Sequence, residues 1–260
     1  MLRTMKITME HSKDGVTARQ FELTVAGDVV PGMLWTPAEG RGPRPLVLIG
    51  HGGGLHKMAP PIEGAALRYV KSLGYAVAAI DAPEHGARVS KEEAARIGAR
   101  DREQIARAGG MRGEALETAM RRAAAVQPEW TATLDAIESL DVVGPLGPVG
   151  YAGLSMGALL GIPFVASEPR VKAAVFGCAG VGGADQPLAQ AGRRITVPLV
   201  FAMQWDDELI PRDEALALFE AFGSPEKTLH ANQGGHREVP AFERSSWEAF
   251  FLRHLGTIRA

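Results

Sequence analysis

Cysteine is almost absent from this sequence of 260 residues, which contains only Cys178. A single cysteine excludes a disulfide framework and a cysteine-rich zinc site, and it suits a reducing compartment. An excess of charge of one sign is absent as well, because 28 Lys and Arg residues are balanced by 30 Asp and Glu residues. Nucleic-acid binding usually needs a basic surface, so the sequence predicts no nucleic-acid partner.

Long apolar runs are also missing. No segment approaches the roughly 20 consecutive apolar residues that a membrane span needs. The N-terminal segment 1–15 has no apolar core of the kind found in a secretory signal. Hydrophobic residues nevertheless make up 46% of the chain, enough for a sizeable core without metal or disulfide support. These features predict a soluble cytoplasmic protein that has no membrane partner.

Short apolar runs alternate with helical stretches along the chain. Runs that are apolar on both faces are typical of strands buried under helices on both sides of a sheet. A hairpin is predicted at 17–25 and 28–35, and further strands at 45–49, 75–80, 149–152, 171–176, 197–203 and, more weakly, 227–230. Helices are predicted near 62–72, 128–140, 156–167, 212–222 and 240–255. This alternation predicts one three-layer α/β domain over residues 1–260 with an antiparallel edge.

The segment 87–127 interrupts the alternation. It is rich in Ala and Arg, its apolar residues recur at helical spacing, and Gly109-Gly110 predict a break between two helices. Such an insertion between a strand and the next core helix predicts either a lid over the carboxyl edge of the sheet or a surface helical hairpin. The sequence leaves both alternatives open.

The strongest local motif is the pentapeptide Gly153-Leu-Ser155-Met-Gly157. It follows the apolar run 149–152 and precedes a helical stretch, which is the strand–turn–helix setting of a nucleophile elbow. The turn strains the serine backbone, so small residues two before and two after it must let neighbouring chains pass. The hydroxyl then lies at a helix N-terminus, where the dipole favours developing negative charge. The motif predicts Ser155 as a nucleophile.

A serine hydroxyl needs a base to remove its proton, and the base needs a carboxylate that holds it in one tautomer. His236 is the best candidate base, because it follows two glycines in a late loop between the strand at 227–230 and the final helix. The acid is expected after the strand at 197–203, where Asp207 is the first choice and Asp206 the alternative. The order serine, acid, histidine is not that of the trypsin-like or subtilisin-like enzymes.

Donors for an oxyanion are expected in His51-Gly52-Gly53-Gly54, which directly follows the strand at 45–49. Glycines let backbone N–H groups approach a bound carbonyl without a Cβ clash. The N–H of Gly53, or alternatively of Gly54, is predicted to act together with the N–H of Met156. Each donor of this kind stabilises a transition state by roughly 2.7–4 kcal/mol.

Metal and nucleotide sites have little support. The histidines and acids of the loops at 51–56 and 81–85 lack the H-E-x-x-H spacing of a zinc enzyme. No G-x-x-x-x-G-K-[ST] motif occurs, and no G-x-G-x-x-G motif follows a strand. The sequence therefore predicts no metal and no nucleotide cofactor.

The motifs, taken together and in this order along the chain, resemble the α/β-hydrolase superfamily. They are His51-Gly-Gly-Gly54, Gly153-x-Ser155-x-Gly157, Asp207-x-x-Ile-Pro211 and Gly235-His236. The chain is most similar to the dienelactone-hydrolase-like and prolyl-oligopeptidase-like serine esterases, through the hairpin end Leu34-Trp-Thr-Pro37 and the segment Asp81-Ala-Pro-Glu-His85-Gly86. This resemblance implies a mostly parallel eight-stranded sheet, no metal, no organic cofactor, and the catalytic acid at Asp207.

One departure from that family affects the expected substrate. Dienelactone hydrolases carry cysteine as the nucleophile, where this chain has Ser155, so carboxylic esters are expected instead. Cys178 follows a different strand and is expected to be a small buried residue. The predicted function is hydrolysis of a small-molecule ester through an acyl-enzyme, with the oligomeric state left open. The alternatives are a small-peptide amidase or peptidase, a thioesterase, and a non-catalytic ligand-binding member of the fold.

Overall fold

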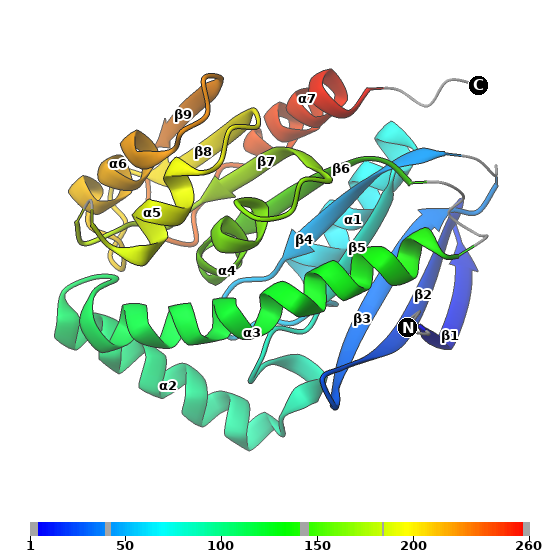
Figure 1. Cartoon of the computed structure of the whole chain (residues 1–260), viewed down its shortest axis with the longest axis horizontal. Coiled ribbons are helices and arrows are strands. Elements are labelled where there is room, and N and C mark those ends of the chain that lie inside the picture. The colour runs from blue at the N-terminus through cyan, green and yellow to red at the C-terminus, as the bar shows by residue number, and fades with distance from the viewer. Residues whose placement is uncertain (1–4, 40–42, 141–145, 184, 257–260) are drawn as a thin grey trace.

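Nine strands form the central sheet of the computed structural model, which describes residues 5–39, 43–140, 146–183 and 185–256. The strands are β1 (Lys6–Lys13), β2 (Val16–Val25), β3 (Asp28–Pro37), β4 (Arg44–Gly50), β5 (Ala76–Ile80), β6 (Leu146–Leu154), β7 (Val171–Gly177), β8 (Leu199–Gln204) and β9 (Lys227–Asn232). Their order across the sheet is β1-β2-β3-β5-β4-β6-β7-β8-β9 (Figure 1). The pairs from β5 to β9 are parallel, whereas β1, β2, β3 and β5 pair antiparallel.

The sheet has one strand more than the eight predicted, and the additional strand is β1. Every residue of β1 is exposed, so the strand has no buried face, and its apolar residues are limited to Ile7 and Met9. The hairpin that follows is confirmed, because β2 and β3 pair in register up to a tight turn that joins Val25 to Asp28. The mostly parallel α/β architecture is also confirmed.

Helices cover both faces of the sheet (Figure 1). On one face, α1 (Pro60–Leu73) and α7 (Glu243–Leu255) share a hydrophobic cluster with Val47 and Ile49 of β4. On the other face, Leu46 and Leu48 of the same strand join a larger cluster, as the alternation of side chains along a strand requires. That face is covered by α3 (Gly113–Glu138), α4 (Met156–Val165), α5 (Pro187–Arg193) and α6 (Arg212–Ala221). The result is three layers around two hydrophobic clusters.

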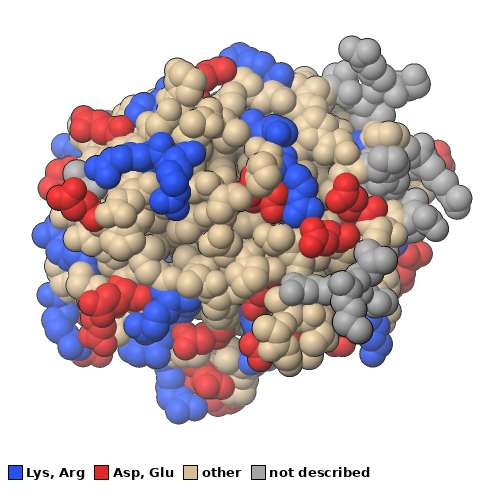
Figure 2. Space-filling view, viewed as in Figure 1, with Lys and Arg blue, Asp and Glu red and all other residues tan. Residues whose placement is uncertain are grey.

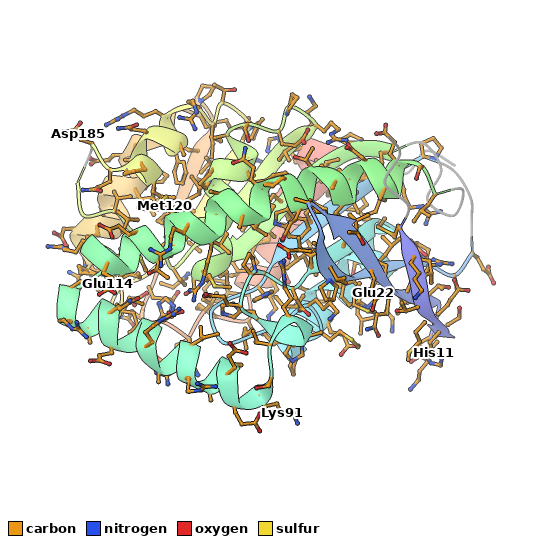
Figure 3. The ribbon with its side chains drawn as sticks, turned by 60° about the horizontal axis from the view of Figure 1, so that its bottom comes forward. His11, Glu22, Lys91, Glu114, Met120 and Asp185 are labelled. Carbon is orange, nitrogen blue, oxygen red and sulfur yellow. The ribbon has the colours of Figure 1, made fainter. Side chains whose placement is uncertain are left out.

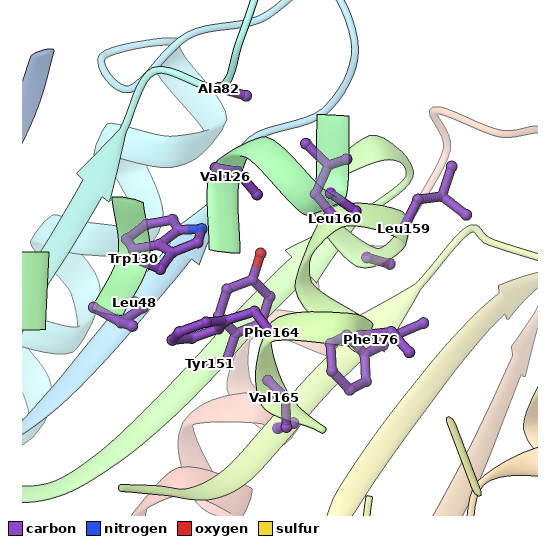
Figure 4. Close-up of a cluster of buried hydrophobic side chains, with 14 of the residues drawn as sticks. Leu48, Ala82, Val126, Trp130, Tyr151, Leu159, Leu160, Phe164, Val165 and Phe176 are labelled. Atoms are coloured by element: carbon purple, nitrogen blue, oxygen red, sulfur yellow. The ribbon is translucent and has the colours of Figure 1, made fainter. Parts of the chain in front are cut away.

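Aromatic side chains fill the space between β6 and α4 (Figure 4). The ring of Tyr151 on β6 lies 5.9 Å from that of Phe164 on α4 and 6.0 Å from that of Trp130 on α3, measured between centroids. The hydroxyl of Tyr151 donates a hydrogen bond of 2.8 Å to the carbonyl of Gly157. This packing fixes the first turn of α4 against the strand that precedes it, and so fixes the tight turn between them.

The segment 87–127 contains α2 (Lys91–Ala108) and the first half of α3 (Figure 3, where Lys91 and Glu114 mark the first turns of the two helices). Ser90 caps α2 by accepting a hydrogen bond from the N–H of Glu93. Gly109 ends α2 with a φ of 66°, a conformation that glycine adopts without a steric cost. The predicted break at Gly109-Gly110 is therefore confirmed.

The predicted start of a separate core helix at residue 128 is wrong. A single helix, α3, runs from Gly113 to Glu138 and includes Pro128. The predicted end of the insertion, at residue 127, therefore lies inside this helix and not at its end. Buried apolar side chains continue along the whole of α3 and pack in the larger cluster, which stabilises the helix across the proline. The predicted domain limits at residues 1–4 and 257–260 lie outside the described residues.

Ion pairs attach the insertion to the rest of the molecule. The side chain of Arg112, in the turn between α2 and α3, pairs with the buried carboxylate of Glu214 on α6. Arg122 of α3 lies 2.7 Å from Asp101 of α2, and it also contacts Glu84 in the loop after β5. The guanidinium groups of Arg122 and Arg100 hold the pKa of Glu84 below its usual range. The role of residues 87–127 as a lid stays a prediction.

The face of the molecule drawn in Figure 2 carries charges of both signs. On the face in Figure 2, Lys and Arg side chains lie among Asp and Glu side chains around a broad uncharged area. The presence of both signs agrees with the formal net charge of −2. Among the described residues, none of the helices combines the length and the apolar character that crossing a bilayer requires.

Candidate active site

Ser155 lies in the turn between β6 and α4, at the carboxyl edge of the parallel strands. Its φ of 55° is positive, which a residue with a side chain rarely adopts. The N–H of Ser155 donates to the carbonyl of Gly177 at 2.9 Å, and its carbonyl accepts from the first turn of α4. These bonds hold the strained turn and place the hydroxyl at the N-terminus of the helix.

The two glycines of the pentapeptide are needed for close packing. A Cβ on Gly153 would lie 2.5 Å from the carbonyl oxygen of Gly157, which is closer than real Cβ atoms approach. A Cβ on Gly157 would collide with the carbonyl of Gly50 at the end of β4. The backbone of the turn therefore passes directly against the neighbouring strand, as the sequence predicts.

Gly157→Ala is expected to destabilise the fold by about 3 kcal/mol, because the backbone carbonyl of Gly50 cannot move away without disturbing β4. Gly64→Ala is the matched control, since its Cβ meets nothing within 4 Å in the interior of α1. That control is expected to raise stability by about 0.5–1 kcal/mol. Urea unfolding of both variants measures the difference. Equal stability of Gly157→Ala and the wild type would contradict the close packing.

His236 and Asp207 lie beside Ser155 and form a continuous hydrogen-bonded chain with it. The Oγ atom of Ser155 is 2.8 Å from Nε2 of His236. On the other side of the ring, Nδ1 is 2.8 Å from Oδ2 of Asp207. The second carboxylate oxygen of Asp207 accepts from the N–H groups of Leu209 and Ile210 at 2.8 and 2.9 Å. The carboxylate is thus oriented by the backbone and holds the imidazole with Nε2 free to accept a proton.

The two loops that carry the base and the acid are joined by backbone hydrogen bonds. The N–H of Trp205 donates to Asn232 at 2.6 Å, and that of Asp206 donates to Gly234 at 3.2 Å. Of the two candidate acids, Asp207 contacts the imidazole, whereas the side chain of Asp206 is mainly exposed and lies 4.0 Å from Arg212. The geometry therefore favours Asp207, and Asp206 lies outside the hydrogen-bonded chain.

The backbone of Gly53 lies close to the residue after the serine. A Cβ built on Gly53 would lie 4.0 Å from the Cβ of Met156, so the loop after β4 runs beside the start of α4. Within the described part of the chain, neither N–H donates a hydrogen bond. Gly53 is exposed to solvent. Gly54 has a φ of 72°, a backbone conformation that residues with a side chain rarely adopt. The structure thus places Gly53 near Met156, and no other group of the described residues accepts from either N–H.

The buried side chain of His51 is hydrogen-bonded to the backbone of this loop and of the loop after β5, a role that was not predicted from the sequence. Its Nε2 accepts from the N–H of Ala82 at 3.0 Å, so the proton must be on Nδ1, which lies 2.9 Å from the carbonyl of Gly52. Burial is the main reason that the pKa of His51 falls to about 4, so the ring is neutral at physiological pH. The imidazole fixes the Gly52 peptide and hence the direction of the neighbouring N–H of Gly53.

A buried ion pair lies beneath the same loop. The carboxylate of Asp81 accepts from the backbone N–H of Lys57 at 2.9 Å and from its ammonium group at 2.7 Å. It also accepts from the N–H of Ala87 at 2.8 Å. Asp81 therefore connects the loop after β4 to the loop after β5. The sequence shows the motif of each loop, at His51–Gly54 and at Asp81–Gly86. It does not show that the two loops touch, because their contact depends on β4 and β5 being neighbours in the sheet.

One further group of donor atoms could be considered as a metal site. Cys178 Sγ, a carboxylate oxygen of Asp207 and a ring nitrogen of His236 lie within 4.8 Å of one another. Burial, together with the charges of Asp207 and Glu208, raises the pKa of the Cys178 thiol to about 12. Nδ1 of His236 and Oδ2 of Asp207 are already hydrogen-bonded to each other at 2.8 Å. The three groups fit a base held by a carboxylate better than a metal centre. Cys178 is buried, as predicted.

Several solved structures with a similar fold are esterases. A PEG-bound cold-adapted esterase from an Arctic intertidal metagenomic library is 36% identical, with a TM-score of 0.78, over 95% of this chain and 98% of that chain. The native structure of a cold-adapted esterase from such a library is 33% identical, with a TM-score of 0.72, over 95% and 97% of the two chains.

An acetyl xylan esterase from Paenibacillus sp. R4 shares the fold at 16% identity, with a TM-score of 0.73, over 97% of this chain and 89% of that chain. No protein-family model matches the chain, and no curated protein matches it either.

Proposed function

Since the chain belongs to the esterases of the α/β-hydrolase fold, we propose that it hydrolyses carboxylic esters through Ser155, His236 and Asp207. One observation carries this proposal. Two hydrogen bonds of 2.8 Å link the serine hydroxyl to the imidazole and the imidazole to a backbone-oriented carboxylate. This is the arrangement that makes a serine hydroxyl nucleophilic at neutral pH.

In the acylation step, Oγ of Ser155 attacks the ester carbonyl carbon while Nε2 of His236 takes the hydroxyl proton. The carbonyl oxygen becomes an oxyanion, which accepts hydrogen bonds from the N–H groups of Gly53 and Met156. The imidazolium then gives its proton to the alcohol oxygen, the C–O bond of the ester breaks, and the alcohol leaves. The product of this step is an acyl ester on Ser155.

Deacylation repeats the sequence with water. His236 removes a proton from a water molecule, which attacks the acyl carbon, and the oxyanion again lies against Gly53 and Met156. Collapse of the tetrahedral intermediate releases the carboxylic acid, and His236 returns the proton to Ser155. Asp207 stays ionised throughout, because its role is to orient the imidazole and stabilise its charged form.

We propose the insertion 87–127 as the part of the chain that limits substrate size. Arg122 and Arg112 attach it to the loop after β5 and to α6, so it borders the edge of the sheet that carries the site. The cytoplasmic location stays a prediction, and so does the small-molecule nature of the ester.

A panel of p-nitrophenyl esters from acetate to palmitate tests the proposed function. The wild-type protein is expected to hydrolyse at least the short members, at rates that saturate with substrate concentration. Absence of hydrolysis across the panel would contradict the proposal for carboxylic esters. If Ser155 were then still labelled by a fluorophosphonate, the substrate would be an amide or a thioester. Absence of both reactions would indicate a non-catalytic ligand-binding protein.

A further inference from the structure

Two residues outside the proposed triad hold the backbone of His236. Its N–H donates to Oε2 of Glu208 at 2.9 Å. Its carbonyl oxygen lies 3.7 Å from the thiol sulfur of Cys178. Because the ring is bonded to Asp207, the residue is fixed at its backbone nitrogen, its backbone oxygen and its ring.

The two glycines that precede His236 leave room for the Glu208 carboxylate beside the backbone of this loop. A Cβ on Gly235 would lie 2.8 Å from Oε2 of Glu208, so any larger residue at this position would displace the carboxylate. Gly234 has a φ of 105°, which turns the chain so that successive N–H groups face acidic side chains. The N–H of Gly235 donates to Glu238 at 2.6 Å, next to the bond from His236 to Glu208.

Glu208 and Cys178 are in the protonation states that their hydrogen bonds to the His236 backbone require. The hydrogen bond from the N–H of His236 lowers the pKa of Glu208, so the carboxylate is ionised at neutral pH. A charged acceptor makes a stronger and more directional bond than a neutral one. The Cys178 thiol keeps its proton and can therefore donate to the carbonyl of His236, although a thiol is a weak donor. Glu208 is thus the stronger of the two contacts.

We propose that Glu208 is a positioning residue of the esterase, which acts by holding the backbone N–H of His236 so that the ring reaches Ser155 and Asp207 together. This inference rests on the proposed triad. Asp207 and Glu208 are adjacent in one loop, so a single loop fixes both the ring and the backbone of the base. Glu208 touches neither the substrate nor the reacting atoms; its effect passes through His236.

Glu208→Ala is expected to lower kcat for p-nitrophenyl acetate about tenfold with little change in KM, since a small misplacement of the base slows the chemical step rather than binding. Glu208→Gln is expected to recover most of the loss, because its amide oxygen can accept the same N–H. Asp213→Ala, which removes another exposed carboxylate in the first turn of α6, is the matched control and is expected to leave kcat unchanged.

Gly235→Ala provides an independent variant, because its Cβ displaces the Glu208 carboxylate without changing residue 208. It is expected to lower kcat about as much as Glu208→Ala does. The double variant is expected to be no slower than either single variant, since both changes remove the same hydrogen bond. Thermal unfolding of each variant checks that the fold is retained.

Three results would overturn the inference: an unchanged kcat in Glu208→Ala, no recovery in Glu208→Gln, or multiplied losses in the double variant. Ser155→Ala, measured in the same assay, distinguishes a failure of the proposed function from a failure of the proposed role of Glu208. Retained activity in Ser155→Ala would contradict the proposed function itself. Lost activity in Ser155→Ala with unchanged activity in Glu208→Ala would contradict only the role of Glu208.

Discussion

Ser155→Ala is expected to lower kcat for p-nitrophenyl acetate by roughly 10⁴–10⁶-fold, as removal of a nucleophile that acts in concert with its base does elsewhere. The loss is large because no other hydroxyl is hydrogen-bonded to Nε2 of His236 among the described residues. The fold is expected to persist, since the turn is held by backbone bonds and by its flanking glycines rather than by the hydroxyl. Steady-state kinetics and a thermal unfolding curve measure the two effects.

Ser72→Ala is the control for this experiment, because Ser72 is an exposed serine on α1. It is expected to retain the wild-type rate. A Ser155→Ala protein within tenfold of the wild type would show that ester hydrolysis occurs at another residue.

Asp207→Asn is expected to lower kcat by about 10³–10⁴-fold, because an amide in place of the carboxylate favours the wrong imidazole tautomer. The neutral amide can accept from Leu209 and Ile210 with its oxygen, so the loop is expected to keep its geometry. Its NH₂ group would then face Nδ1 of His236, and the proton would move to Nε2. That nitrogen could no longer accept the proton of Ser155.

Asp206→Asn is the matched control for the acid, since the two aspartates are adjacent and only Asp207 contacts the ring. It is expected to change kcat less than about threefold, because an exposed charge outside the hydrogen-bonded chain has little effect. A larger loss in Asp206→Asn than in Asp207→Asn would reverse the assignment and require a different loop conformation.

Much of the fold could be predicted because its central strands are buried on both faces. Such strands appear in the sequence as short continuous apolar runs, and Leu46 to Ile49 in β4 are an example. β1 could not be predicted in the same way, because all of its side chains are exposed and its side-chain contacts with β2 are polar, such as the ion pair of Glu10 with Arg19 at 2.6 Å. α5, with seven residues, is too short to show a helical period.

The limits of α3 could not be predicted for a different reason. Pro128 is compatible with the first turn of a new helix and also with the interior of a long helix that packing supports. Burial along the whole of α3 decides between the two. That burial depends on α4 and the sheet, which are not neighbours of Pro128 in the sequence.

The candidate site was easier to predict where a motif encodes the local geometry. The pentapeptide around Ser155 requires its glycines within one turn, and the loop at His51 follows a strand directly, so both are visible in the sequence. The contacts of Glu208 and Cys178 with His236 were not predictable, because they join β7 and the loops after β8 and β9. Only the order of the strands brings these segments together.

The most direct test of the account is the site of covalent labelling by a fluorophosphonate. The wild-type protein is incubated with the probe, digested, and its peptides are analysed by mass spectrometry. We expect one phosphonylated residue, Ser155, with labelling lost in Ser155→Ala and strongly slowed in His236→Ala. An adduct at any other residue, or equal labelling of Ser155→Ala and the wild type, would contradict the assignment of Ser155 as the nucleophile of this esterase.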